Sequence, residues 1–350
     1  MTRTTMTRTT MTRTTMTRTA MSYLPKRTAR RVLVSATAAL ALSLSACTGA
    51  TYVPTPTTSA PPSTTATAAP TTSTTTAPPV TCTNATTSYD ALAALPNAAG
   101  DQGRLGDIAR RGYLIAGVSA DTLLLGSRNP LTGQLEGFDI DVVRELARAI
   151  FGDPSKVKFT VITASQRIPV LQSRTVDVVA RNMTMTCPRW QDIAFSTEYY
   201  HSGQKVLVRK GSTAKTLADL AGQRVCAPNG TSSMAKLKES TSVTAVGSDT
   251  HTGCLVLFQQ GKVDAITGDD TVLAGLVAQD PYAEVTASDP ITAEPYGLGF
   301  HKDDKALVQY ANTVLAQMRA DGRWTAIYNR WLAPSLGPAP APPTPIYGRA

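Results

Sequence analysis

The chain has 350 residues, of which 42% are hydrophobic and 17% charged, enough for one or two globular domains with attached low-complexity segments. No apolar run reaches the roughly 18 residues that a membrane-spanning helix needs, which excludes a polytopic membrane protein. The net charge of +9 arises from residues 1–46, which carry eight Lys and Arg and no acid. The remainder has a charge of +1, which argues against a nucleic-acid partner.

The first 46 residues have the layout of an export signal. Residues 1–20 are four pentapeptides that each begin with Met, and we interpret them as an overcalled start, with Met21 as the initiator. A basic stretch then precedes the short apolar segment 32–44, as in a signal peptide. The following Leu-Ser-Ala-Cys resembles a bacterial lipobox and predicts a mature chain anchored to the membrane through an acylated Cys47. The alternative is an ordinary signal peptide with a chance cysteine.

Two segments have compositions that disfavour a packed fold. Residues 48–80 contain 13 Thr, 7 Pro and 3 Ser and no charge, so we predict that 47–81 is a disordered tether that holds a globular head off the membrane. At about 3.1 Å per residue in a polyproline II conformation, its reach is at most about 100 Å. The tail, residues 336–350, is rich in Pro and is not expected to be helical.

Between about residue 105 and residue 332, β-branched runs alternate with amphipathic segments. In chain order they predict strand 113–118, helix 141–151, strand 157–162, helix 169–173, strand 176–181, strand 224–227, helix 232–239, strand 243–246, helix 251–260, strand 264–267 and helices 271–278, 305–320 and 322–332. This alternation is typical of βαβ units and mostly parallel sheets. It predicts an α/β fold that binds a small ligand in a cleft beyond the carboxyl ends of its strands.

Four cysteines remain once Cys47 is set aside, and an even number in an exported chain predicts two disulfides with three possible pairings. We favour Cys226–Cys254, because both lie in the same central segment. Cys82–Cys187 would then join the N-terminal extension to the body. The alternative is free buried thiols.

The sequence predicts neither a metal nor a cofactor. It has no CxxC motif, and its three histidines lie 50 residues apart, at His201, His251 and His301.

Seven short segments are informative through their order and spacing: GFDID at 137–141, RNMTMTCPR at 181–189, FSTEYY at 195–200, GQRVC at 222–226, NGTSS at 229–233, VDAITGDD at 263–270 and PYGLGF at 295–300. Together they resemble the family 3 solute-binding proteins, the polar amino-acid receptors of ABC importers. The lipobox, the four cysteines and the Pro-rich tail look like the actinobacterial, GlnH-like branch of glutamine-binding lipoproteins.

The resemblance implies a type II periplasmic-binding-protein fold. Two α/β lobes are then joined by two hinge strands, with the ligand cleft between them. Residues 100–204 plus 296–335 are expected to form lobe 1, and residues 205–295 lobe 2.

The resemblance also implies a site for the α-carboxylate of an amino acid. Arg189 lies five residues after Thr184, as in the family, and its planar guanidinium suits a bidentate ion pair. Thr184 is expected to donate its hydroxyl to the same carboxylate. Asn182 occupies the position that binds the ligand through a backbone carbonyl, where many relatives have Gly or Ser. The alternatives are a surface role for Arg189 and ordinary strand propensity for Thr184.

The second lobe is expected to contribute two further contacts. Gly230 and Thr231 precede a predicted helix, whose free N–H groups form an anion site. The simpler alternative, compatible with the first, is that Thr231 or Ser232 caps the helix. Asp269 follows a predicted strand and would bind the ligand ammonium group, with Asp270 as a helix cap. The alternative is that both aspartates are caps.

Arg167 and His251 bear on specificity. They match positions that face the side-chain carboxylate in the glutamate- and aspartate-binding subgroup, and cations there favour Glu or Asp over Gln or Asn. Against this, Ser119 stands where that subgroup has an additional Arg. The alternative for Arg167 is a solvated residue at a helix start, and for His251 the corresponding surface interpretation is favoured.

The leading functional interpretation is a monomeric, lipid-anchored binding protein on the extracytoplasmic face of the membrane. It would capture glutamate, aspartate, glutamine or asparagine, have no enzymatic activity, and deliver the ligand to ABC permease subunits. Relatives of this kind suggest a second possibility, an amino-acid sensor that signals through a membrane partner to a kinase. The third, an enzyme on the same scaffold, needs an acid or base placed against a scissile bond, and no nucleophile–base pair stands out.

Overall fold

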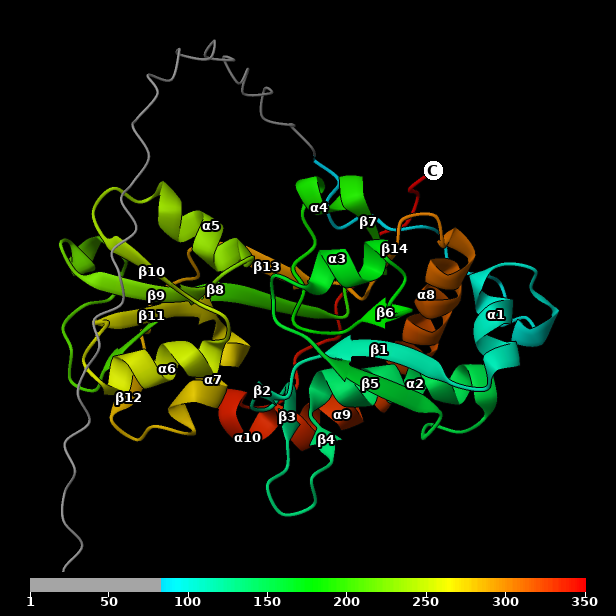
Figure 1. Cartoon of the computed structure of the whole chain (residues 1–350), viewed down its shortest axis with the longest axis horizontal. Helices are drawn as coiled ribbons and strands as arrows, with labels where there is room; N and C mark the ends of the chain where they lie inside the picture. The colour runs from blue at the N-terminus through cyan, green and yellow to red at the C-terminus, as the bar shows by residue number, and fades with distance from the viewer. Residues whose placement is uncertain (1–82) are drawn as a thin grey trace, which may run out of the picture. The chain divides into compact units, whose positions relative to one another are not determined.

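The computed structural model describes residues 83–350. The predictions for the export signal, for Cys47, for the tether and for Cys82 therefore lie outside the described residues. Within the described part, no helix is both long and apolar enough to cross a membrane. Two large sheets, each with its own helices, organise this part of the chain (Figure 1).

Lobe 1 is the name used here for the first sheet and the elements around it. The sheet has the order β5-β1-β6-β14-β7, in which β1 is parallel to β5 and β6, and β14 is antiparallel to β6 and β7. Its strands are β1 (Leu114–Val118), β5 (Val157–Val161), β6 (Val178–Val179), β7 (Ile193–Phe195) and β14 (Gly299–His301). Its helices are η1 (Ala98–Gly100), α1 (Arg104–Arg111), α2 (Phe138–Phe151), α3 (Arg167–Gln172), α4 (Cys187–Asp192), α8 (Lys305–Ala320), α9 (Arg323–Trp331) and α10 (Ala333–Leu336). A small antiparallel sheet contains β2 (Asp121–Thr122), β3 (Gly126–Arg128) and β4 (Leu135–Glu136).

Lobe 2 is the second sheet with its helices. The sheet has the order β10-β9-β11-β8-β12, with β9 parallel to β10 and β11, and β8 antiparallel to β11 and β12. Its strands are β8 (Tyr200–Arg209), β9 (Arg224–Pro228), β10 (Thr244–Ser248), β11 (Ala265–Asp269), β12 (Ala283–Val285) and β13 (Ala293–Tyr296). Its helices are η2 (Ala218–Leu220), α5 (Ser232–Glu239), α6 (His251–Gln259) and α7 (Asp270–Val277).

The chain crosses between the two sheets along β8 and β13. These strands lie side by side, paired antiparallel from Tyr200 opposite Tyr296 to Gly203 opposite Ala293 (Figure 1). The chain enters β8 soon after β7 of the first sheet, and it leaves β13 for β14 of the same sheet. Two adjacent connections allow the lobes to rotate about one shared line, which is the arrangement expected of hinge strands.

Three threonines cap the N-termini of α4, α5 and α6. The hydroxyls of Thr186, Thr231 and Thr250 accept the backbone N–H three residues further on, at 3.4, 3.0 and 3.0 Å. Such N-caps satisfy donors that the first helical turn leaves without partners. They set where α4, α5 and α6 begin, and hence the positions of Arg189, Ser232 and His251.

The C-terminal tail is not helical after Leu336, as expected, but it packs on lobe 1. Ile346 forms a bridge with Thr87, and its carbonyl accepts the N–H of Ser88 at 2.9 Å. The guanidinium of Arg349 lies 3.7 Å from the ring centroid of Trp190, a cation–π contact.

The predicted disulfide Cys226–Cys254 is confirmed and joins β9 to α6, with Cα atoms 5.6 Å apart. Cys187 is also disulfide-bonded. Its predicted partner Cys82 lies outside the described residues, so that pairing stays a prediction.

Replacing Cys226 and Cys254 together by alanine is expected to destabilise the protein by about 3.5 kcal/mol, because the bond closes a loop of 28 residues and restricts the unfolded chain. For a protein of this size the melting temperature falls by about 10 °C. Calorimetry of the variant and the wild type measures the difference. A melting temperature unchanged to within about 2 °C would contradict the expectation.

Candidate ligand-binding site

A cavity of about 180 Å³ lies where the two lobes meet. Its lining residues are Arg167, Asn182 and Thr184 from lobe 1 and Thr231, Ser232, Ser233, His251 and Asp269 from lobe 2. Six of the eight predicted ligand-binding residues are among them. The space between these side chains is narrow and in this arrangement leaves no room for a water molecule, so a ligand can enter only when the lobes move apart.

Arg189 joins the lobes at the margin of this cavity. Its Nη1 donates to the carbonyl of Thr184 at 2.6 Å in lobe 1, and its Nη2 donates to the carbonyl of Gly230 at 3.2 Å in lobe 2. The residue is only 9% exposed, so its interpretation as a surface arginine is wrong. A buried guanidinium held by backbone carbonyls keeps its charge available for an anion.

Arg167 is buried as well, and the solvated alternative is wrong. It is 2% exposed, and its Nε donates to the carbonyl of Ala164 at 2.9 Å. Its Nη1 reaches the carbonyls of Arg181 and Asn182, both at 3.1 Å, and its Nη2 reaches that of Gly230 at 3.0 Å. Burial and the neighbouring charge of Arg189 lower the pKa of Arg167 well below its usual value.

At Gly230 the backbones of the two lobes approach each other closely. It has a φ of +74°, and a Cβ there would lie 2.7 Å from the Cα of Ser165 in lobe 1. Only glycine fits such a contact. Its carbonyl accepts from Arg167 and Arg189.

Thr231 acts as a helix cap, which confirms the simpler interpretation. Its hydroxyl accepts the N–H of Met234 and donates to the carbonyl of Pro228 at 2.7 Å. With its hydroxyl engaged on both sides, the residue caps α5 at the wall of the cavity.

Glu294 was missed by the sequence analysis and links the hydroxyls of both lobes. Its Oε2 accepts from Thr184 at 2.5 Å and from Ser232 at 2.6 Å, and its Oε1 accepts from Thr292 at 2.6 Å. It lies on the crossover strand β13 and is 2% exposed. Thr184 therefore donates to a carboxylate, as predicted for a ligand carboxylate, but here to that of the hinge.

Asp269 ends β11 with its carboxylate inside the cavity wall. It is 4% exposed and accepts the hydroxyl of Tyr296 at 2.7 Å. Its side chain makes no helix-cap hydrogen bond, so the cap alternative is wrong for Asp269. Asp270 does accept the N–H of Thr271, at 2.7 Å. Burial and the negative charge of Glu294 raise the pKa of Asp269 to about 7, so a cation beside it would favour the ionised form.

The backbone of Asn182 explains why the position suits glycine. Its φ is +37°, in the left-handed region that asparagine tolerates better than most residues. Its N–H donates to Asp139 at 2.9 Å, and Asp139 also accepts the hydroxyl of Tyr199 at 2.8 Å. Burial raises the pKa of Asp139 to about 6.

His251 is the first residue of α6 but is 2% exposed, so the surface interpretation is wrong. Burial, together with the positive charge of Arg181, lowers its pKa to about 3. The imidazole is therefore neutral near pH 7 and offers hydrogen bonds rather than the positive charge we expected.

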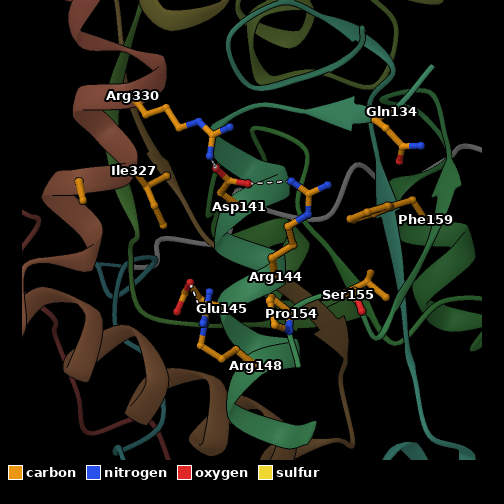
Figure 2. A pocket seen from close by; sticks show the side chains of 12 residues that line it. Gln134, Asp141, Arg144, Glu145, Arg148, Pro154, Ser155, Phe159, Ile327 and Arg330 are labelled. Carbon is orange, nitrogen blue, oxygen red and sulfur yellow. Dashed lines mark hydrogen bonds and ion pairs between the residues drawn. The ribbon is translucent and has the colours of Figure 1, made fainter. Parts of the chain in front are cut away.

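A second, broader pocket lies on the surface of lobe 1, between α2, β5 and α9 (Figure 2). Its charges are matched locally: Asp141 accepts from Arg144 at 2.9 Å and pairs with Arg330 at 3.5 Å, and Glu145 pairs with Arg148 at 3.2 Å. None of the predicted ligand-binding residues lines it. In the described part of the chain, no group of three or more His, Cys, Asp or Glu could hold a metal ion.

Two α/β lobes that enclose a buried polar cavity define a two-lobed binding protein. The chain belongs to the bacterial extracellular solute-binding proteins, family 3, and its match to this family spans residues 114–334. This confirms the resemblance and the type II periplasmic-binding-protein fold. The fold and the family are those of substrate-binding receptors and not of enzymes.

Several relatives of this chain are named for the amino acid that they bind. The ABC transporter glutamine-binding protein GlnH of Bacillus subtilis is 35% identical over 63% of this chain and 81% of its own length. The glutamate-binding protein GluB of Corynebacterium efficiens is 30% identical over 70% of this chain and 86% of its own. Among solved structures, a mutant of the T. maritima protein ArgBP has a TM-score of 0.61 and 30% identity, over 65% of this chain and 98% of that one.

Proposed function

We propose that this protein captures a polar amino acid, namely glutamate, aspartate, glutamine or asparagine, outside the cell and delivers it to an ABC permease. The observation that carries the proposal is the opposite charge of two buried residues, Arg189 beside the inter-lobe cavity and Asp269 in its lining, which act on each other electrostatically. A free amino acid carries one carboxylate and one ammonium group, so it complements this pair. The relatives named for glutamine and glutamate support the same ligand class.

The capture step follows from where the contacts originate. Arg189, Thr184 and Asn182 belong to lobe 1, whereas Asp269 and Ser232 belong to lobe 2. A ligand that touches both sets binds the closed arrangement more tightly than an open one and shifts the population toward it. Closure about β8 and β13 would then present one defined surface to the permease.

Calorimetric titration of the purified protein with L-Glu, L-Asp, L-Gln and L-Asn tests the proposal. L-Leu, which has the same α-groups but an apolar side chain, is the matched control. We expect one ligand per protein for at least one of the four, with micromolar affinity or better, about −8 kcal/mol or more favourable. No heat with any of the four, from protein shown to be folded by circular dichroism, would refute the proposal.

We also propose that the protein acts as a monomer anchored through acylated Cys47. The wild type is expected to incorporate radiolabelled palmitate in a bacterial host and to remain with the membrane fraction. Cys47→Ser removes the thiol that is acylated, and the variant is expected to take up no label and to appear in the medium. A labelled Cys47→Ser protein would contradict the anchor site.

A further inference from the structure

Four buried polar atoms around the cavity form no hydrogen bond with any residue that the structure describes. They are Nη1 and Nη2 of Arg181, Oδ1 of Asn182 and Nδ1 of His251. Asn182 and His251 line the cavity, and the carbonyl of Arg181 accepts from Arg167, which also lines it. The remaining three such atoms belong to Arg104 and Arg319, whose guanidinium groups bond to residues outside the lining. Native proteins satisfy the great majority of their buried polar groups. Two such atoms in the cavity lining, on Asn182 and His251, and two more on the adjacent Arg181 therefore indicate a ligand that supplies the partners.

Among these residues, Arg181 has the greatest need of a partner, because it is charged and only 1% exposed. It follows β6, and its Nε donates to the carbonyl of Ile162 at 2.9 Å, which holds the guanidinium at the carboxyl end of β5. Its own carbonyl accepts from Arg167. Its positive charge also acts on His251, whose pKa it lowers. Arg181 thus lies beside two residues of the cavity wall.

No carboxylate of the described chain forms an ion pair with Arg181. Asp121 and Asp139 are the acids that act on it electrostatically, but neither lies within ion-pair distance. Asp139 already accepts from Tyr199 and from the N–H of Asn182, and Asp121 accepts from Ser119 at 2.9 Å. The guanidinium therefore keeps two adjacent donors, Nη1 and Nη2, for a further acceptor.

Two adjacent guanidinium N–H donors match a carboxylate, which accepts both in a bidentate ion pair. A side-chain amide has one acceptor oxygen and an NH₂ group that only donates. If an amide were placed there, one donor would face another and the buried charge would stay uncompensated. Arg189 and Asp269 are already assigned to the α-groups. Arg167 donates to four backbone carbonyls, and His251 is neutral near pH 7, so Arg181 is the cation left for the ligand's side chain.

We propose that Arg181 determines specificity by pairing through Nη1 and Nη2 with the side-chain carboxylate of the ligand, so that the receptor prefers glutamate and aspartate to their amides. The inference rests on the proposed function, because it takes the ligand to be an α-amino acid held by Arg189 and Asp269.

Calorimetry with L-Glu and L-Gln on the wild type and on Arg181→Gln tests this preference. The wild type is expected to bind L-Glu at least about tenfold more tightly than L-Gln. Arg181→Gln should weaken L-Glu by about 30-fold or more, because it removes one partner of a buried charge pair, and should change L-Gln by less than about threefold. Arg181→Lys, which keeps the charge without the paired donors, should restore part of the L-Glu affinity only.

A structural role for Arg181 gives a different result. Arg181→Met replaces an uncompensated buried charge with an apolar chain, so its melting temperature without added amino acid is expected to rise. Lower thermal stability, with equal losses for L-Glu and L-Gln, would overturn the proposal. Arg148→Gln, a change at an exposed arginine outside the cavity, is the control and should alter neither affinity.

The two levels of the proposal fail in different ways. If the wild type binds neither the acids nor the amides, the proposed function is wrong. If the wild type binds L-Gln as tightly as L-Glu, or if Arg181→Gln leaves the ratio of the two affinities unchanged, only the assignment of Arg181 is wrong.

Discussion

Replacing Arg189 by alanine is expected to weaken amino-acid binding by at least about 30-fold. The guanidinium is buried and bonded to the carbonyls of Thr184 and Gly230, one in each lobe, so the change removes both the partner of a ligand carboxylate and a contact between the lobes. Truncating one member of a buried charge pair costs about 2–5 kcal/mol, which corresponds to a loss of affinity between about 30-fold and several thousand-fold.

Titration of Arg189→Ala with the tightest of the four amino acids measures the effect. Arg189→Lys should recover only part of the affinity, because an ammonium group cannot form the bidentate pair. Arg148→Ala again serves as the control, since that arginine is exposed and bonds to Glu145 on the surface. If Arg189→Ala bound the amino acid within about threefold of the wild-type affinity, Arg189 would not be the partner of the ligand carboxylate.

Replacing Asp269 by asparagine is expected to weaken binding by about 100-fold, because the ligand ammonium loses its buried carboxylate. The change is nearly isosteric and retains an acceptor for the hydroxyl of Tyr296. Asp270→Asn, at the first residue of α7, is the matched control and is expected to leave the affinity nearly unchanged. If Asp269→Asn bound as tightly as Asp270→Asn, Asp269 would not be the ammonium partner.

The pKa of Asp269 also predicts how binding depends on pH. Burial and Glu294 raise this pKa to about 7, and the ligand ammonium favours the ionised carboxylate. Below pH 7 the protein must therefore lose a proton to bind, and affinity should fall by about tenfold for each pH unit. Titrations between about pH 5.5 and pH 8 measure this slope, which Asp269→Asn should abolish. An affinity of the wild type that is constant over this range would contradict the assignment.

The same shift predicts a cost in stability. The pKa of Asp269 in the folded protein, about 7, lies above the ordinary value of 3.8, so the folded state binds this proton more tightly than the unfolded state. Its contribution to stability is therefore present at about pH 4 and is lost as the pH rises through 7. Asp269→Asn should raise the melting temperature relative to the wild type near pH 8 and not near pH 4.

The buried ionisable residues Arg167, His251 and Asp269 are better explained by ligand binding than by the stability of the fold. Burial lowers the pKa of Arg167 and His251 and raises that of Asp269, each toward the uncharged form. A fold that needed only stability would carry apolar side chains there. Under the proposed function, a bound amino acid would supply the opposite charges and offset the desolvation cost, and strongly shifted groups are typical of functional sites.

The sequence predicted 13 helices and strands, which is half of the 26 elements in the described residues, and it did not place the crossover strand β8. The pattern of β-branched runs and amphipathic segments predicted β1, α5 and α6 to within about two residues. It missed β13, because Pro295 cannot donate to a ladder and therefore argues against a strand. The strand tolerates it because the only full ladder of β13 is with β8, and its other side forms an isolated bridge between Tyr296 and Thr184.

The site could be predicted where a motif fixes spacing, as for Thr184 and Arg189. It could not be predicted where burial depends on the opposite lobe. His251 begins a helix and looks exposed in the sequence, and only the packing of the lobes buries it. Nothing in the local sequence marks Arg181 and Glu294 as site residues, because the identity of a charged residue does not show whether the fold buries it.

The crystal structure of the protein bound to L-glutamate tests the central claim most directly. We expect the ligand between the lobes, with its α-carboxylate on Arg189, its ammonium group on Asp269 and its side-chain carboxylate on Arg181, at hydrogen-bond distances of about 3 Å. A ligand bound elsewhere, for instance in the surface pocket of Figure 2, or bound between the lobes without contact to Arg189 and Asp269, would contradict it.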